Sequence, residues 1–133
     1  MVEGRTVLII EDNQLNLDLF KYVLEHAGWT VVWAMDPEQA RALLDSPPPD
    51  IILMDIQLPG CDGQTLAKEF RQKPGFETVP IIALTAHAMR GDRERFLAVG
   101  FNGYIAKPVQ VRTFSDEIAQ FLELAETGSG FES

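Results

Sequence analysis

Short apolar runs recur along the chain, with segments of helical spacing between them. Three of the runs, Val7–Ile10, Ile51–Met54 and Ile81–Leu84, contain no polar residue. Uninterrupted apolar runs of this length are typical of parallel strands that are covered on both faces of a sheet. Thr30–Ala34, which is β-branched and aromatic, and Tyr104–Ala106 complete a set of five predicted strands.

Helical signals lie after each of these runs. In the first helical segment, apolar residues recur at intervals of three and four, and Gly28 follows as a C-cap. Pro37 behind Asp36 marks the second, because proline is favoured at the first helical position behind an N-cap residue. The first predicted helix has Phe20, Val23, Leu24 and Ala27 on its apolar face. The next three helices are predicted over residues 37–45, 64–72 and 87–98. The last predicted helix has one apolar face, formed by Val111, Phe114, Ile118, Phe121 and Leu122.

The order is therefore strand then helix, five times over, which predicts an α/β domain. Strands that alternate with helices through short loops form a parallel sheet with helices on both faces. We expect a single domain over residues 1–126. Residues 127–133 are small and polar with two glycines, and we expect a disordered tail there.

Composition narrows the possible partners. Lysine and arginine number 11 and aspartate and glutamate 20, so the formal charge is 11 − 20 = −9. An acidic surface repels the phosphate backbone, so we expect no direct nucleic-acid binding. The single cysteine excludes an internal disulfide, and no apolar run reaches the roughly 18 residues that a membrane span needs. We expect a cytoplasmic protein without membrane contact.

Polar residues follow four of the five predicted strands. In open α/β sheets, ligands bind outside the carboxyl ends of the strands, so these residues are expected to converge at one edge of the sheet. The set comprises three carboxylates, one hydroxyl and one ammonium, from Glu11, Asp12, Asp55, Thr85 and Lys107.

This set suits magnesium and phosphoryl chemistry. Magnesium prefers oxygen ligands and is usually held by one or two carboxylates together with water. Asp12 and Asp55 are the candidate direct ligands, with Glu11 acting directly or through water. A carboxylate beside a metal can also act as a nucleophile toward phosphorus. Phosphoryl transfer needs mainly positioning and charge neutralisation, to which Lys107 and Thr85 would contribute.

Each of these residues also has a simpler interpretation. An acid at a strand end, such as Asp12, is often a helix N-cap or a turn residue. Asp55 could belong to a loop ahead of the Pro59-Gly60 turn, and Thr85 could cap the helix that begins near His87. Lys107 could be a solvated surface lysine. The joint placement of the residues at one edge favours a functional site.

Four motifs in order carry a family resemblance. They are Val7-Leu8-Ile9-Ile10-Glu11-Asp12-Asn13, Ile52-Leu53-Met54-Asp55-Ile56-Gln57-Leu58-Pro59, Ala83-Leu84-Thr85-Ala86 and Tyr104-Ile105-Ala106-Lys107-Pro108. From about Thr6 to Leu124 the chain resembles the receiver domain of two-component response regulators. Residues Thr85–Glu94 are similar to receivers of the DivK type and of hybrid histidine kinases.

The resemblance implies a flavodoxin-like (CheY-like) fold, a doubly wound five-stranded parallel sheet in the order 2-1-3-4-5 with five helices. It also implies roles for single residues. The phosphoacceptor would be Asp55, and the Mg²⁺ ligands would be Glu11, Asp12, Asp55 and the backbone carbonyl of Gln57. Thr85 and Lys107 would contact the phosphoryl group, and Thr85 and Tyr104 would form the switch pair. The peptide bond before Pro108 would be cis.

The function implied is that of a phosphoacceptor, not an enzyme. A histidine kinase or a histidine phosphotransfer protein would phosphorylate Asp55. Thr85 would then move toward the phosphate and Tyr104 would fill the vacated space. A downstream protein would read the change at the face of the fourth helix, fifth strand and fifth helix.

Three other functions remain to be weighed. A haloacid-dehalogenase-like phosphatase expects a second Asp two residues after the first, where this chain has Gln57, and a longer chain. A flavodoxin expects a hydroxyl-rich phosphate loop after the first strand, which this chain lacks. A pseudo-receiver would keep the fold as a protein-binding module without phosphotransfer, and the intact set of polar strand-end residues argues against it.

Overall fold

The structure is a computed structural model that describes residues 3–58, 61–86 and 92–126. Strands and helices alternate along it as predicted. In order, the elements are β1 (Thr6–Ile10), α1 (Gln14–His26), β2 (Thr30–Ala34), α2 (Pro37–Ala42), the 3₁₀ helix η1 (Leu43–Asp45), β3 (Ile51–Asp55), β4 (Gln57–Leu58), β5 (Cys61–Asp62), α3 (Gly63–Gln72), β6 (Ile81–Thr85), α4 (Asp92–Val99), β7 (Gly103–Ala106) and α5 (Phe114–Glu126).

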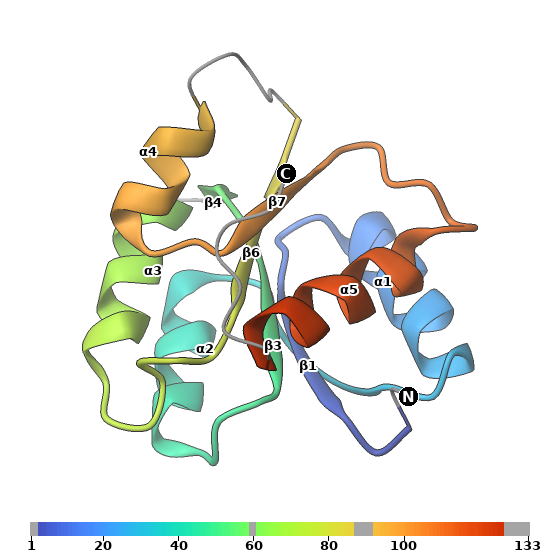
Figure 1. Cartoon of the computed structure of the whole chain (residues 1–133), viewed down its shortest axis with the longest axis horizontal. Helices are drawn as coiled ribbons and strands as arrows, with labels where there is room; N and C mark the ends of the chain where they lie inside the picture. Colours follow the sequence, from blue (N-terminus) through green and yellow to red (C-terminus); the bar gives the residue numbers. More distant parts are fainter. Residues whose placement is uncertain (1–2, 59–60, 87–91, 127–133) are drawn as a thin grey trace.

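Five of the strands form one parallel sheet in the order β2-β1-β3-β6-β7. Numbered among themselves, these strands follow the predicted order 2-1-3-4-5. The flavodoxin-like prediction is therefore confirmed (Figure 1). The short strands β4 and β5 pair separately as an antiparallel hairpin directly after β3, which the sequence did not predict.

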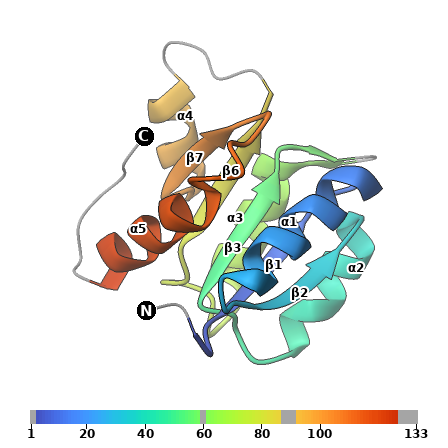
Figure 2. The same ribbon diagram turned by 90° about the vertical axis from the view of Figure 1, so that its right-hand side faces the viewer.

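Side chains of successive strand residues point to opposite faces of the sheet, and helices cover both faces. Val7 and Ile9 of β1 belong to a core with α1 and α5, whereas Leu8 and Ile10 belong to a core with α2, α3 and α4. Figures 1 and 2 show these two helical layers on either side of the sheet. All five residues of β3 are buried, because the strand is central and covered on both faces.

Local signals at the helix ends agree in part with the predictions. Asp36 caps α2, with its side chain accepting a hydrogen bond from the Gln39 amide at 2.8 Å. Gly28 follows α1 with a φ of +107°, a conformation that favours glycine. At the start of α1, however, the cap is Asn13, which accepts from the Asn16 amide at 2.9 Å. Asp12 is therefore not the N-cap.

Two predicted helix boundaries were wrong. The second helix becomes a 3₁₀ turn after Ala42, ahead of the three prolines that forbid its continuation. The last helix begins at Phe114, so Val111 lies before it with 50% of its surface exposed. Residues 87–91 of the predicted fourth helix and the predicted tail 127–133 lie outside the described residues. Within the described part of the chain, no helix is long and apolar enough to cross a membrane.

The burial pattern predicts where truncation is costly. Replacing Leu53, which is fully buried in β3, with alanine is expected to lower the free energy of unfolding by about 2–5 kcal/mol, because a cavity opens in a strand packed on both faces. Leu97→Ala, at a position with 55% of the side chain exposed, serves as the control and is expected to change it by less than about 0.5 kcal/mol. Equilibrium urea unfolding measures both. Equal effects of the two variants would contradict the assignment of the core.

Candidate functional site

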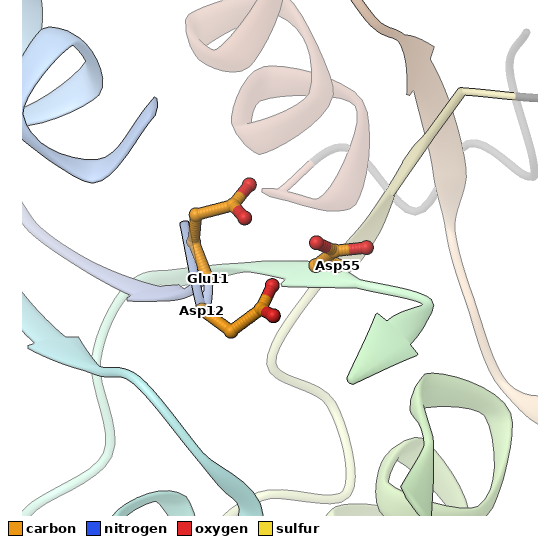
Figure 3. A group of neighbouring side chains, drawn as sticks. All are labelled: Glu11, Asp12 and Asp55. Carbon is orange, nitrogen blue, oxygen red and sulfur yellow. The ribbon is translucent and has the colours of Figure 1, made fainter. Parts of the chain in front are cut away.

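Three carboxylates meet at the carboxyl edge of the sheet. Glu11 and Asp12 follow β1, and Asp55 is the last residue of β3, the strand next to it. One carboxylate oxygen from each lies within 4.8 Å of the others, and Figure 3 shows the three side chains converging. Glu11 and Asp55 are buried, whereas Asp12 is exposed. The site is therefore a half-open acidic recess in which Asp12 faces solvent.

Lys107 lies between the two buried carboxylates. Its Nζ is 2.9 Å from an oxygen of Glu11 and donates a hydrogen bond to Asp55 Oδ2 at 2.9 Å. The Lys107 side chain is only 16% exposed, which excludes the simpler interpretation of a solvated surface lysine. The Lys107–Pro108 peptide bond, expected to be cis, is cis.

Burial and charge act in opposite directions on these groups. Burial raises the pKa of Glu11, and the Asp55 charge adds to the rise, while Lys107 opposes it. For Lys107, burial on its own lowers the pKa, but its close contacts with the Asp55 and Glu11 carboxylates outweigh burial and leave the pKa above its usual value. Lys107 is therefore held in its charged form at neutral pH.

The backbone after β3 fixes the Asp55 carboxylate. The Gln57 backbone amide donates to Asp55 Oδ1 at 2.9 Å, so both carboxylate oxygens of Asp55 accept from a group of the described chain. The Gln57 side chain is exposed, and its main chain opens the β4–β5 hairpin. This hairpin returns the chain to α3 beside the site.

Gly63 is a residue of the site that the sequence reasoning missed. A Cβ on Gly63 would lie 2.6 Å from the Asp55 carbonyl oxygen and 2.6 Å from Ile56 Cα, so only glycine fits. The Gly63 amide donates to the Ile56 carbonyl at 2.9 Å. A glycine at a predicted helix start was the available signal, but its tight packing against Asp55 becomes visible only in three dimensions.

Thr85 and Tyr104 occupy neighbouring strands beside this recess. Thr85 ends β6 with 1% of its surface exposed, and its carbonyl accepts from the Lys107 amide at 2.7 Å. Tyr104 of β7 pairs with Ala83 of β6 and is partly buried. Its ring centre lies 5.8 Å from that of Phe96 in α4. The two residues thus connect the acidic recess to the face that carries α4.

The arrangement suits a hard divalent cation. Three carboxylates and one ammonium have a formal charge of −3 + 1 = −2, and one of the carboxylates, Asp12, is exposed. Carboxylate oxygens are the ligands that Mg²⁺ prefers, and the exposed position of Asp12 leaves room for the waters that this ion retains.

Comparisons with known proteins show the family and agree with the fold. Residues 7–119 match the family model of the response regulator receiver domain. The chain is 38% identical over 118 residues to the polar-differentiation response regulator DivK of Brucella anthropi, covering 89% of this chain and 96% of that protein. DivK of Brucella suis is equally similar, with the same coverage.

Two solved structures extend the comparison. The first is the receiver domain of a sensor histidine kinase from Pseudomonas aeruginosa, with a magnesium ion coordinated in its active-site cleft. It is 36% identical with a TM-score of 0.80, and the match covers 90% of this chain and 98% of that one. The second is the chemotaxis response regulator CheY4 of Vibrio cholerae, which is 25% identical with a TM-score of 0.83, covering 88% and 98%.

The ion pairs of Lys107 predict a pH-dependent stability. Lys107→Met is expected to lower the free energy of unfolding at pH 7 by about 1–3 kcal/mol, because two buried carboxylates lose their cation. Removing the cation raises the pKa of Glu11 further, so Glu11 takes up a proton as the pH falls, and the difference from wild type is expected to shrink as the pH is lowered below neutral. Lys107 itself stays charged throughout this range because its own pKa is raised.

Urea unfolding at several pH values measures this difference. Lys68→Met, at an exposed lysine of α3, provides the control and is expected to change stability little at any pH. A destabilisation by Lys107→Met that stays constant with pH would contradict the coupling to Glu11.

Proposed function

The chain belongs to the response regulator receiver domain family, and from this we propose that Asp55 accepts a phosphoryl group and thereby changes the contacts of the protein with other proteins. Receiver domains are signalling modules that interact with kinases and other proteins rather than classical enzymes. The observation that carries the proposal is the position of the Asp55 carboxylate, between the Lys107 ammonium and two further carboxylates.

We assign the metal ligands of this site to the acidic cluster. Asp12 and Asp55 would hold Mg²⁺ directly, Glu11 directly or through water, and the Gln57 backbone carbonyl would complete the protein ligands. The oxygen donor set and the net negative charge support this assignment. When bound, the metal supplies positive charge that neutralises the phosphoryl oxygens.

The transfer itself is a displacement at phosphorus. An oxygen of Asp55 forms a bond to phosphorus as the bond from phosphorus to the donor histidine nitrogen breaks, and that nitrogen keeps the electron pair and takes up a proton. Lys107 already contacts the Asp55 carboxylate at 2.9 Å, so its charge lies where the phosphoryl oxygens arrive. Thr85, at the end of the adjacent strand, is the hydroxyl donor in this proposal.

The phosphodonor would be a histidine kinase or a histidine phosphotransfer protein that docks on α1. The outward face of this helix carries Leu15, Leu19 and Tyr22, which are 80%, 38% and 63% exposed. Leu19 also lines a hollow with Lys107 and Val109, next to the site. An exposed apolar face beside a reactive group is typical of an interaction surface.

The output would be read at the edge of the sheet that β7 forms. Tyr104 lines a groove of about 420 Å³ together with Glu117, Phe121 and Leu124 of α5, and its ring lies beside Phe96 of α4. Movement of Thr85 toward a phosphoryl group and of Tyr104 into the space that it leaves would reshape this groove. A downstream protein with different affinities for the two shapes would receive the signal.

Phosphorylation can be tested with a small donor. Incubation with phosphoramidate and Mg²⁺ is expected to add one phosphoryl group to the intact protein, while Asp55→Asn and removal of Mg²⁺ with EDTA are each expected to abolish the addition. Intact-mass spectrometry measures the product. Asp50→Asn is the matched control, because Asp50 lies just before the opposite end of β3. An unmodified wild-type protein would instead support a pseudo-receiver.

The switch can be followed at its tyrosines. The chain has two, Tyr22 and Tyr104, so fluorotyrosine labelling gives two ¹⁹F signals that Tyr22→Phe assigns. Beryllofluoride with Mg²⁺, which mimics an aspartyl phosphate, is expected to shift the Tyr104 signal and leave the Tyr22 signal, from α1, in place. The Tyr104 shift is expected to disappear in Thr85→Ala. A Tyr104 signal whose chemical shift stays the same when beryllofluoride is added would overturn the proposed switch.

A further inference from the structure

Arg71, in the last turn of α3, fastens three segments of the chain together. Its Nε and Nη2 donate to the Gly100 carbonyl at 3.0 and 2.7 Å, and its Nη1 donates to the Phe76 carbonyl at 3.1 Å and to the Val79 carbonyl. Nη2 also donates to the side-chain oxygen of Asn102. One guanidinium thus joins α3 to the loop before β6 and to the turn between α4 and β7.

The partners of Arg71 are neutral. Among the described residues no carboxylate forms an ion pair with it, and burial lowers its pKa. A partly buried cation without a counterion is stable only where its donors are satisfied, and the carbonyls and the Asn102 oxygen satisfy them. A planar fork of donors is needed for so many acceptors at once, and lysine does not supply one.

Asn102 extends the contacts of Arg71 into the sheet. The side-chain oxygen of Asn102 also accepts from the Ile81 backbone amide at 2.9 Å, and the backbone amide of Asn102 donates to the Ile81 carbonyl at 2.7 Å. Gly100, with a φ of +106°, brings the backbone so close that a Cβ there would lie 3.0 Å from Arg71 Cγ. The carboxyl end of α4 and the amino end of β6 are therefore fixed to the same side chain.

Asn102 directly precedes β7 and Ile81 begins β6, the two strands that would carry the phosphoryl-contacting groups. β6 runs from Ile81 to Thr85, and β7 pairs with it from Gly103 onward. Lys107 follows β7, and its amide donates to the Thr85 carbonyl at 2.7 Å. Register fixed at the amino ends is transmitted along the hydrogen-bonded pair, because a slip would move every side chain.

We propose that Arg71 is a positioning residue of the phosphorylation site: with Asn102 it clamps the amino ends of β6 and β7 to the carboxyl end of α4, and so holds Thr85 and Lys107 in register beside Asp55. This inference rests on the proposed function of Asp55. It adds a role for a residue whose closest contacts lie at the opposite end of the sheet from the reaction.

The clamp is tested first in the unmodified protein. Arg71→Met and Asn102→Ala are each expected to speed amide hydrogen exchange in the 100–104 turn by about tenfold. Asn102→Asp keeps the accepting oxygen, so its exchange rate in this segment is expected to stay within about twofold of the wild-type rate. Leu24→Ala, in the core on the α1 side of the sheet, lowers global stability without touching the clamp and serves as the control.

The positioning role is tested by the rate of phosphorylation. With phosphoramidate and Mg²⁺, the rate constant for modification of Asp55 is expected to fall about fivefold in Arg71→Met and Asn102→Ala, about what the loss of one hydrogen bond at the site would cause. Arg71→Lys is expected to lie between these variants and wild type. Asn102→Asp and Leu24→Ala are expected to remain within about twofold of wild type.

Each outcome decides between the two proposals. If wild type is phosphorylated and both clamp variants behave like Leu24→Ala in exchange and in rate, the positioning role is overturned while the proposed function stands. If wild type is not phosphorylated at Asp55, the proposed function fails and the positioning role fails with it. Asn102→Ala decides the matter if Arg71→Met does not fold.

Discussion

Both faces of the central sheet are covered by helices, and this constraint determines where polar chemistry can occur. A strand such as β3, with all five residues buried, cannot carry an exposed polar side chain along its length. Polar groups therefore gather at the strand ends. Because the five strands are parallel, their carboxyl ends lie at one edge and bring Glu11, Asp55 and Thr85 into one recess.

Burial at that edge makes the charged form of the carboxylates unfavourable, and Lys107 offsets part of this cost. Two carboxylates enclosed by protein are poorly solvated and also repel each other, and both effects raise the pKa of Glu11. The Lys107 ammonium, 2.9 Å from each, offsets part of that cost, but the site keeps a net negative charge. The groups that are paired inside the protein therefore leave a net negative charge, which would attract a cation in the proposed function.

Sequence patterns predicted the order of the strands and the residues that leave them, because apolar runs and strand-end positions are local features. They did not predict contacts between distant segments. Asn13 rather than Asp12 caps α1, since neighbouring polar residues compete for one cap and only the backbone geometry decides. Sequence patterns also gave no sign of two close contacts that only the folded chain creates. These are the tight packing of Gly63 against Asp55 and the hydrogen bonds of Arg71 to the α4–β7 turn. The β4–β5 hairpin was missed because two-residue strands leave no periodic signal.

The hydrogen bonds of Arg71 have a consequence for how the sequence can diverge. Apart from Asn102, its acceptors are backbone carbonyls, which every amino acid supplies. An exposed residue of the same loop, such as Glu77, can therefore change identity without cost to these bonds. In relatives of this chain, selection would act on Arg71 and on the side chain at position 102, while exposed positions of the loop between α3 and β6, such as Glu77, would be free to vary.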